Sequence, residues 1–258
     1  MDISWPDVLL STVLILVAVV LSVWKGLRAE RSIVWSALRA AVQLLVVGLL
    51  FRLIFESASA MTWAWVWVIG MVIVSSEVVK RRAPGIPIVR AGAYVALGGA
   101  LVVCLGIVFG LRVFVLEPVT FVVVAGITLG NTMPSAVLAV DVAAKAFTEN
   151  PGRIEGVLAL GMDSTAVNRL ITPEAVRAAL IPQIERTKVV GLIALPGAMT
   201  GMLLAGADPF SAVLVQLVIM YLILGAVAIA VVTVVVLVGV RAFTADGRLE
   251  EWVRTQTR

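Results

Sequence analysis

The sequence predicts an all-α polytopic membrane protein with about seven transmembrane helices, an external N-terminus and a cytosolic C-terminus. Its 258 residues are 61% hydrophobic and 14% charged, and their mean hydropathy is +1.10. Soluble domains are nearer half apolar and a quarter charged. Several continuous apolar runs are long enough to cross a hydrocarbon core of about 30 Å as helices. Lysine and arginine gather in alternate loops, and this asymmetry predicts the orientation.

Missing residue types exclude several classes of function. The chain has no histidine, which removes histidine-based catalysis, histidine proton relays and imidazole metal sites. Its single cysteine, Cys104, lies in an apolar run, so no disulfide forms within one chain and we interpret Cys104 as a packing residue. The net charge of +4 comes from basic residues in particular loops, so it indicates topology rather than binding of nucleic acid.

Seven apolar windows reach or approach the roughly 20 residues that a spanning helix needs. They cover residues 8–24, 33–55, 61–79, 92–115, 119–140, 189–207 and 210–240. We expect one transmembrane domain over 1–258, with residues 141–188 as a cytosolic segment. The first run follows Asp2 and Asp7 instead of a basic region, so it does not have the pattern of a cleaved signal peptide.

Basic residues favour the loops after the first, third and fifth windows and the C-terminal tail. These regions hold Lys25, Arg28, Arg31, Lys80, Arg81, Arg82, Arg90, Lys145, Arg153, Arg169, Arg177, Arg186, Lys188, Arg241, Arg248, Arg254 and Arg258. The alternate loops hold only Arg52 and Arg112. Because cytosolic loops are rich in lysine and arginine, the N-terminus is predicted outside and the C-terminus in the cytosol.

Residues 141–188 form the longest polar stretch, which is too short for a catalytic domain. The chain has no G-x-x-x-x-G-K-[ST] pattern, so we expect no ATP site of the P-loop type. The stretch predicts two short helices. The first stops at Gly161, with Asp163 or Ser164 as a fresh start, and the second opens with Thr172 as N-cap and Pro173 at its first helical position.

The first of these helices resembles the cytosolic coupling helix of ABC-transporter permeases, in which an E-A-A-x-x-x-G pattern docks into a groove of the ATPase subunit. Glu155 and Gly161 have that spacing, with Leu158 on the apolar side of the helix, while Gly156 and Val157 replace the two alanines. The resemblance implies that Glu155, Leu158 and Gly161 couple the chain to an ATPase. The alternative is an amphipathic helix lying along the inner membrane surface.

Longer motifs resemble the FetB-type (UPF0014) permease family, which includes plant membrane proteins linked to aluminium tolerance. The chain contains, in order, "LALG", "ALIP", "VGLIALPGAMTGMLLAGADP" and "QLVIMY". Its "LRAAVQLLVVGLL" and "GITLGNTMPSAVLAV" also look like spans of that family. Met162 departs from the L-A-L-G-A that the family usually shows. The resemblance covers nearly the whole chain.

This resemblance implies the permease subunit of an ABC transporter in the plasma or inner membrane, exporting a metal ion such as iron. The chain is then no enzyme and binds no cofactor itself, because ATP is used by a separate cytosolic ATP-binding subunit. Two copies would match the usual pair of ATPase subunits, so we expect a homodimer embedded in the lipid bilayer. No nucleic-acid partner is expected.

Polar groups predicted near mid-depth are candidates for the substrate path, because each needs a partner or an aqueous cavity. Counting 1.5 Å per residue places Gln43, Asn131 and residues 196–200 about 10–18 Å from a membrane face. Pro134 and Pro196 weaken their helices there, which is typical of transport sites. The candidate residues are Gln43, Glu77, Asn131, Met133, Pro196, Met199 and Thr200.

Several alternatives stay open for these residues. Gly197 and Gly201 have the spacing of a close helix contact, so packing is the favoured interpretation for them, while for Asn131 an interhelical hydrogen bond is the alternative to a role in the substrate path. The methionines could bind a soft metal but are more often packing residues, and the metal is unknown. Arg39 and Glu77 lie near the inner ends of the second and third windows and could form a structural ion pair; the alternative is that Glu77 binds a cation.

Two other classes of function compete with the ABC permease. An ATP-independent ion carrier or channel would use Glu77 and the broken helices, and an ABC permease for a non-metal substrate such as a sugar nucleotide is also compatible. An intramembrane enzyme is disfavoured, because the chain has neither histidine nor paired intramembrane carboxylates.

Overall fold

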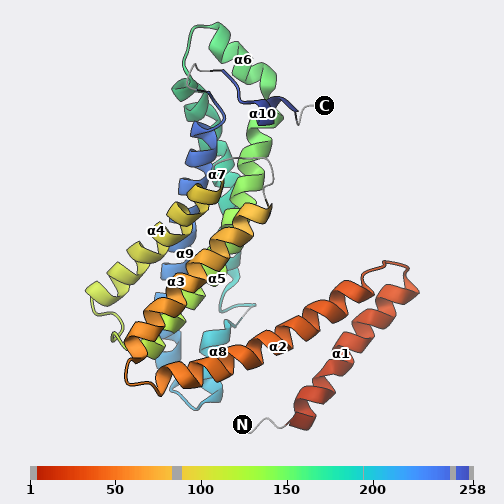
Figure 1. Ribbon diagram of the computed structural model, residues 1–258, viewed down its shortest axis with the longest axis vertical. Helices are drawn as coiled ribbons and strands as arrows, with labels where there is room; N and C mark the ends of the chain where they lie inside the picture. The colour runs from red at the N-terminus through yellow and green to blue at the C-terminus, as the bar shows by residue number, and fades with distance from the viewer. Residues whose placement is uncertain (1–4, 83–88, 194, 245–247, 256–258) are drawn as a thin grey trace. The chain divides into compact units, whose positions relative to one another are not determined.

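Figure 1 shows the computed structural model, which describes residues 5–82, 89–193, 195–244 and 248–255. Every regular element within these residues is a helix. The six helices long and apolar enough to cross a membrane are α1 (Trp5–Trp24), α2 (Glu30–Phe55), α3 (Ala60–Arg82), α4 (Val89–Gly110), α5 (Pro118–Thr148) and α9 (Pro209–Val240). The others are α6 (Pro151–Ala159), α7 (Ser164–Val189), α8 (Gly197–Leu204) and α10 (Glu251–Thr255). The predicted all-α polytopic fold class is confirmed.

The first of two compact units, Met1–Ala60, is a hairpin of α1 and α2. Gly26 turns the chain between them with a φ of 63°. The Ser22 hydroxyl donates to Glu30 Oε2 over 3.1 Å and accepts from the amide of Ala29, also over 3.1 Å. Most apolar side chains of the two helices are exposed within this unit, so they offer surface to lipid or to other helices.

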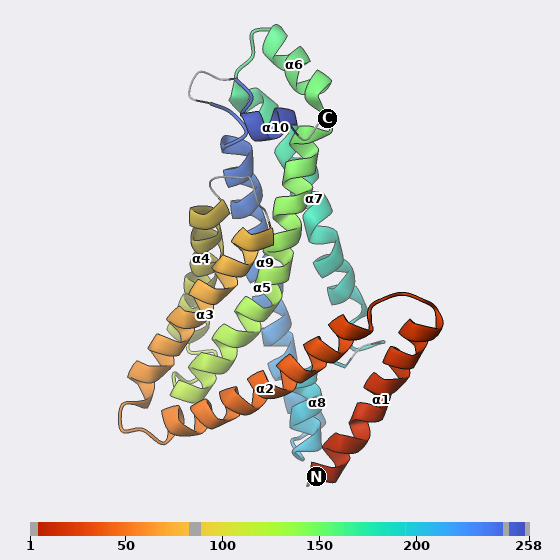
Figure 2. The same ribbon diagram turned by 45° about the vertical axis from the view of Figure 1, so that its right-hand side comes forward.

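The second unit, Met61–Arg258, is built around α5 and α9, which lie side by side in both views (Figures 1 and 2). Helices α4 and α7 each pack against both of them. Helix α3 joins through side chains: the Trp65 ring lies 4.5 Å from that of Phe121 on α5. Small and β-branched residues fill the core of the pair, among them Ala125, Ala136, Ala139, Ala226, Val227, Ala230 and Val231.

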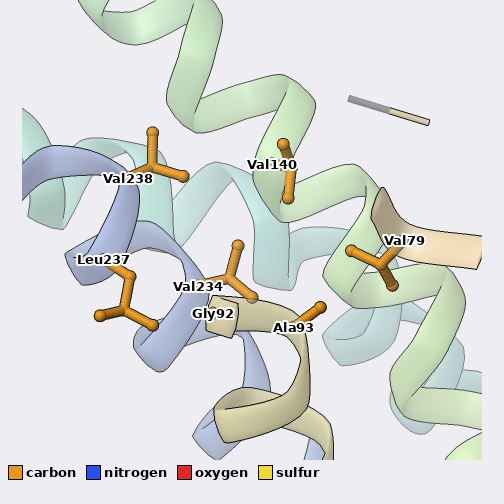
Figure 3. A pocket seen from close by; sticks show the side chains of 7 residues that line it. All are labelled: Val79, Gly92, Ala93, Val140, Val234, Leu237 and Val238. Atoms are coloured by element: carbon orange, nitrogen blue, oxygen red, sulfur yellow. The ribbon is translucent and has the colours of Figure 1, made fainter. Parts of the chain in front are cut away.

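Helices α3, α4, α5 and α9 meet at an apolar junction near the basic end of α3 (Figure 3). The junction encloses a cavity of about 10 Å³ lined by Val79, Gly92, Ala93, Val140, Val234, Leu237 and Val238. A space of this size holds at most about one water molecule. In the residues described here, the four helices therefore offer no route for a polar solute at this junction.

Helix α5 runs without a break through Pro134 and continues past the predicted end at residue 140 to Thr148. Proline lacks the amide that would bond the carbonyl of Gly130. Nearby side chains supply other bonds to the backbone, since the hydroxyl of Thr132 donates to Thr128 O (2.9 Å) and that of Ser135 to Asn131 O (3.1 Å). Buried residues along most of α5 keep it continuous by packing.

The prediction of one spanning helix over 189–207 is wrong. Helix α7 ends at Val189, the chain turns, and α8 begins only at Gly197. Gly191 has a φ of 84°, the left-handed conformation that commonly ends a helix. Pro196 is the N-cap of α8 with an extended backbone, so it interrupts no helix and frees no helical carbonyl of Leu192. The break itself lies where the sequence predicts it.

The prediction of two short helices within residues 141–188 is half wrong. The first helix is α6, and the predicted stop at Gly161 is confirmed by its φ of 77°. No new helix opens at Thr172, because α7 already starts at Ser164 and passes through Pro173. Its buried residues recur every four positions and pack against α5 and α9; they are Val167, Ile171, Ala175, Ala179 and Gln183. This packing outweighs the cost of a proline within the helix.

A close approach between α7 and α9 at Gly239 predicts a stability effect. A Cβ atom there would lie 2.5 Å from Asn168 Oδ1 and 3.3 Å from Phe147 Cζ. We expect Gly239→Ala to lower the free energy of unfolding by about 1–3 kcal/mol through overpacking. Thermal unfolding of the purified protein in detergent measures the change.

Gly225→Ala on the same helix is the matched control, because nothing lies within 4 Å of a Cβ at Gly225. It should leave the melting temperature almost unchanged. Adding Asn168→Ala to Gly239→Ala should restore part of the loss. Equal effects of the two glycine substitutions would contradict the proposed close contact.

Candidate functional site

A polar contact between α5 and α7 lies within the apolar stretch of α5. Arg186 Nη1, in the last turn of α7, donates to Asn131 Oδ1 over 3.1 Å. The Asn131 amide nitrogen in turn donates to Ile127 O over 2.7 Å, which orients the side chain. Counting from the start of α5 at Pro118, Asn131 lies about 20 Å along the helix. The contact therefore lies near the middle of the predicted span 119–140.

Arg186 is the functional candidate that sequence reasoning missed. Its position among basic residues predicts a cytosolic loop, but the bond to Asn131 places its guanidinium beside the apolar stretch of α5. The sequence signal for one long helix is the apolar residue at every fourth position: Val167, Ile171, Ala175 and Ala179. Arg186 is exposed in this unit, and Asn131 is half-buried.

Arg186 has no ion-pair partner among the described residues. No carboxylate of the described residues forms an ion pair with it, whereas its neighbour Glu185 holds Lys188 over 2.7 Å. Pro134 and Gly130, one turn apart on α5, are both exposed close to Asn131 in sequence. A guanidinium and an amide thus meet where α7 contacts α5. Such groups bind polar or anionic solutes.

The predicted residues of α8 do not join this contact. Helix α8 packs against α9, and the Thr200 hydroxyl bonds its own Pro196 carbonyl over 3.1 Å. Pro196, Met199 and Thr200 are half-buried, as is Met133 on α5. The structure therefore brings Asn131 to Arg186 rather than to the "LPGAMTG" segment. A substrate-path role for these residues stays a prediction.

Glu77 has local partners. Its Oε1 lies 3.2 Å from Lys80 Nζ and 3.7 Å from Arg81 Nε on the same helix, α3. Arg39 and Gln43 belong to α2 in the first unit and are exposed there. The Arg39–Glu77 ion pair and the role of Gln43 stay predictions. For the residues that the structure describes, no group of three or more acidic or cysteine side chains could hold a metal ion.

A second candidate site lies at the end of the unit where α5, α7 and α9 extend beyond α3 and α4 (Figures 1 and 2). Helix α6 caps this end, with Ile154 buried, Leu158 half-buried and Glu155 exposed. Residues 160–163, here termed the α6–α7 loop, expose Leu160 (77%) and Met162 (51%) on either side of Gly161.

The α6–α7 loop has a defined geometry. Gly161 adopts a φ of 77°, which side chains with a Cβ rarely adopt. Asp163 then caps α7 by accepting from the amide of Ala166 over 3.0 Å, and this bond lowers the pKa of the Asp163 carboxyl. The loop thus presents two large apolar side chains on a rigid turn, as a protein-docking surface does.

Comparison with known proteins agrees with this architecture. The model of the family described as "Uncharacterised protein family (UPF0014)" matches residues 5–243. The UPF0014 membrane protein slr1647 of Synechocystis is 33% identical over 230 residues, which cover 86% of this chain and 87% of the relative. No solved structure matches the chain.

Two relatives carry more informative names. The protein ALUMINUM SENSITIVE 3 of Arabidopsis thaliana is 32% identical over 93% of this chain and 88% of its own length. The probable iron export permease protein FetB of Escherichia coli is 26% identical over 90% of this chain and 89% of its own length. With a family match across nearly its full length and six helices able to span a membrane, this chain is a multi-pass membrane protein that belongs to the UPF0014 family.

Proposed function

We propose that the chain is the permease subunit of an ABC transporter, which exports a metal ion such as iron and is driven by a separate ATP-binding subunit. The observation that carries the proposal is the α6–α7 loop, which exposes Leu160 and Met162 at the end of the unit that extends beyond α3 and α4. The name of the Escherichia coli relative, a probable iron export permease protein, supports iron export.

The ATP-binding subunit would dock on α6 and the α6–α7 loop. The exposed side chains of Leu160 and Met162 are apolar anchors of the kind that fill a groove on a partner protein. Glu155 adds an exposed negative charge on α6. Ile154 is buried and Leu158 half-buried, and α6 packs against α5 and α7. The chain then contributes no ATPase site of its own and needs no bound cofactor.

The transport path would form between two copies of the chain. The larger cavity between α5 and α9, about 350 Å³, is lined by apolar residues except for Thr120. The polar contact of Asn131 with Arg186 instead lies on an exposed side of the unit. A charged group at mid-depth is tolerated where it faces protein or water rather than lipid. A homodimer that encloses this side supplies such a cavity.

A second candidate function is an ABC permease with a different class of substrate. A permease of the same type for a non-metal compound, such as a sugar nucleotide, is favoured by the positive charge of Arg186 beside Asn131. ATP-dependent uptake of radioactive iron into inverted membrane vesicles tests the metal, provided that the permease and its ATP-binding subunit are expressed together. Uptake equal to that of vesicles without the permease would contradict metal export.

The docking proposal predicts a specific loss on substitution of Gly161. Gly161→Val forces a branched side chain into a φ of 77° and distorts the α6–α7 loop. We expect co-purification of the ATP-binding subunit to fall by about tenfold or more, while the permease still inserts and folds. Pull-down from detergent extracts, normalised to permease amount, measures the loss.

Gly152→Ala in α6 is the matched control, since nothing lies within 4 Å of a Cβ there and its backbone is helical. It should keep the ATP-binding subunit bound. Double substitution of Leu160 and Met162 by serine should reproduce the loss without altering the backbone. Normal co-purification of both disruptive variants would place the docking surface elsewhere.

The break between α7 and α8 predicts an effect on transport. Leucine at both Pro196 and Gly197 removes the N-cap and favours helix across the break. We expect membrane insertion to be preserved and transport to be lost, because the break can no longer bend. Vesicle transport and membrane content are measured on the same preparations.

Leu204→Ala, at the exposed end of α8, is a control that should transport normally. Normal transport by the Pro196→Leu/Gly197→Leu variant would reduce the break to a packing detail.

A further inference from the structure

Among the described residues, no carboxylate forms an ion pair with Arg186. Its guanidinium reaches the neutral side chain of Asn131, and no described carboxylate lies within ion-pair distance. An uncompensated charge beside an apolar stretch is costly, so it needs an anion or an aqueous cavity. The neighbouring acid, Glu185, is already held by Lys188 at 2.7 Å.

Within the described part of the unit that contains Arg186, helices α4, α8 and α9 have no aspartate or glutamate, and the acid of α5 is Asp141. Asp141 is ten residues from Asn131 along α5, or about 15 Å. Glu77 lies beside Lys80 and Arg81.

The groups around Arg186 suit an oxyanion. A guanidinium presents a planar fork of donors that matches a carboxylate or a phosphate group. Asn131 Oδ1 holds one edge of the fork at Nη1 and fixes its position, while the exposed guanidinium keeps other donors available. Pro134 and Gly130 leave this part of α5 without bulky side chains, and both are exposed.

We propose that Arg186, positioned by Asn131, binds an oxyanion group, carboxylate or phosphate, of the transported substrate. This inference rests on the proposed permease function and narrows its substrate class. A metal substrate then reaches the site as an anionic complex with a carboxylate or phosphate ligand, not as a bare cation. The charge of the complex supplies the counter-charge that Arg186 does not have among the described residues.

Binding to the full-length protein in lipid nanodiscs tests the inference. The probes are citrate, inorganic phosphate and ferrous ion alone, and isothermal calorimetry measures each affinity. We expect the wild type to bind at least one of the two oxyanions. Arg186→Gln keeps a hydrogen-bond donor for Asn131 but removes the charge, so it should weaken that binding by about tenfold or more. Arg186→Lys should retain part of it.

Two further variants separate charge recognition from structural damage. Arg177→Ala removes another exposed arginine of α7 and should bind the oxyanion as the wild type does. Asn131→Asp supplies an internal carboxylate to Arg186, so it should raise the melting temperature and weaken oxyanion binding together. A merely structural role of Arg186 would not produce this opposite pair of effects.

Three results would overturn the inference: no oxyanion binding by the wild type, unchanged binding by Arg186→Gln, or ferrous-ion binding that is lost in Arg186→Gln. Transport by vesicles that also contain the ATP-binding subunit distinguishes failure of the oxyanion inference from failure of the permease proposal. Active transport without Arg186-dependent oxyanion binding would refute the inference alone. Absence of ATP-dependent transport of any tested metal, complex or sugar nucleotide would refute the permease proposal, whatever the nanodiscs bind.

Discussion

The larger unit depends on the packing of α7 against α5 and α9. Residues buried at every fourth position, from Val167 to Gln183, give α7 one packing face, although the helix contains Pro173 and Pro182. The facing helices offer small side chains and, at Gly239, no side chain at all, so the backbones approach closely. Without this packing against α5 and α9, nothing would hold the comparatively polar segment 164–189 in the helix bundle.

The packing of α7 against α5 and α9 also determines where the charge of Arg186 lies. It carries the last turn of α7 to the level of Asn131, and so a guanidinium stands beside an apolar stretch of α5. The packing energy of the many buried residues of α7 offsets the cost of placing the Arg186 guanidinium beside an apolar stretch. Proteins commonly tolerate such conflicts at functional sites, where local preference and overall fold disagree.

The long apolar helices could be predicted from sequence, because 20 or more apolar residues have few alternatives to a spanning helix. The stop at Gly161 and the break at Pro196 could also be predicted, since glycine with positive φ and proline punctuate helices. The extent of α7 could not, because basic residues were used as topology signals and Pro173 as a helix start. Tertiary packing overrode both. The Asn131–Arg186 contact joins residues 55 positions apart, and single-sequence periodicity contains no information on such pairs.

The continuity of α7 has a mechanical side. Its first residue follows the capped turn of the α6–α7 loop, and its last turn holds Arg186, so one element of 26 residues, about 39 Å long, joins the two candidate sites. No loop lies between them to absorb a displacement. The softest points are the two missing backbone bonds at Pro173 and Pro182, where a helix bends most easily. A displacement of the α6–α7 loop is therefore transmitted to Asn131 as a tilt or shift of α7 as a whole, and α7 bends most easily at Pro173 and Pro182.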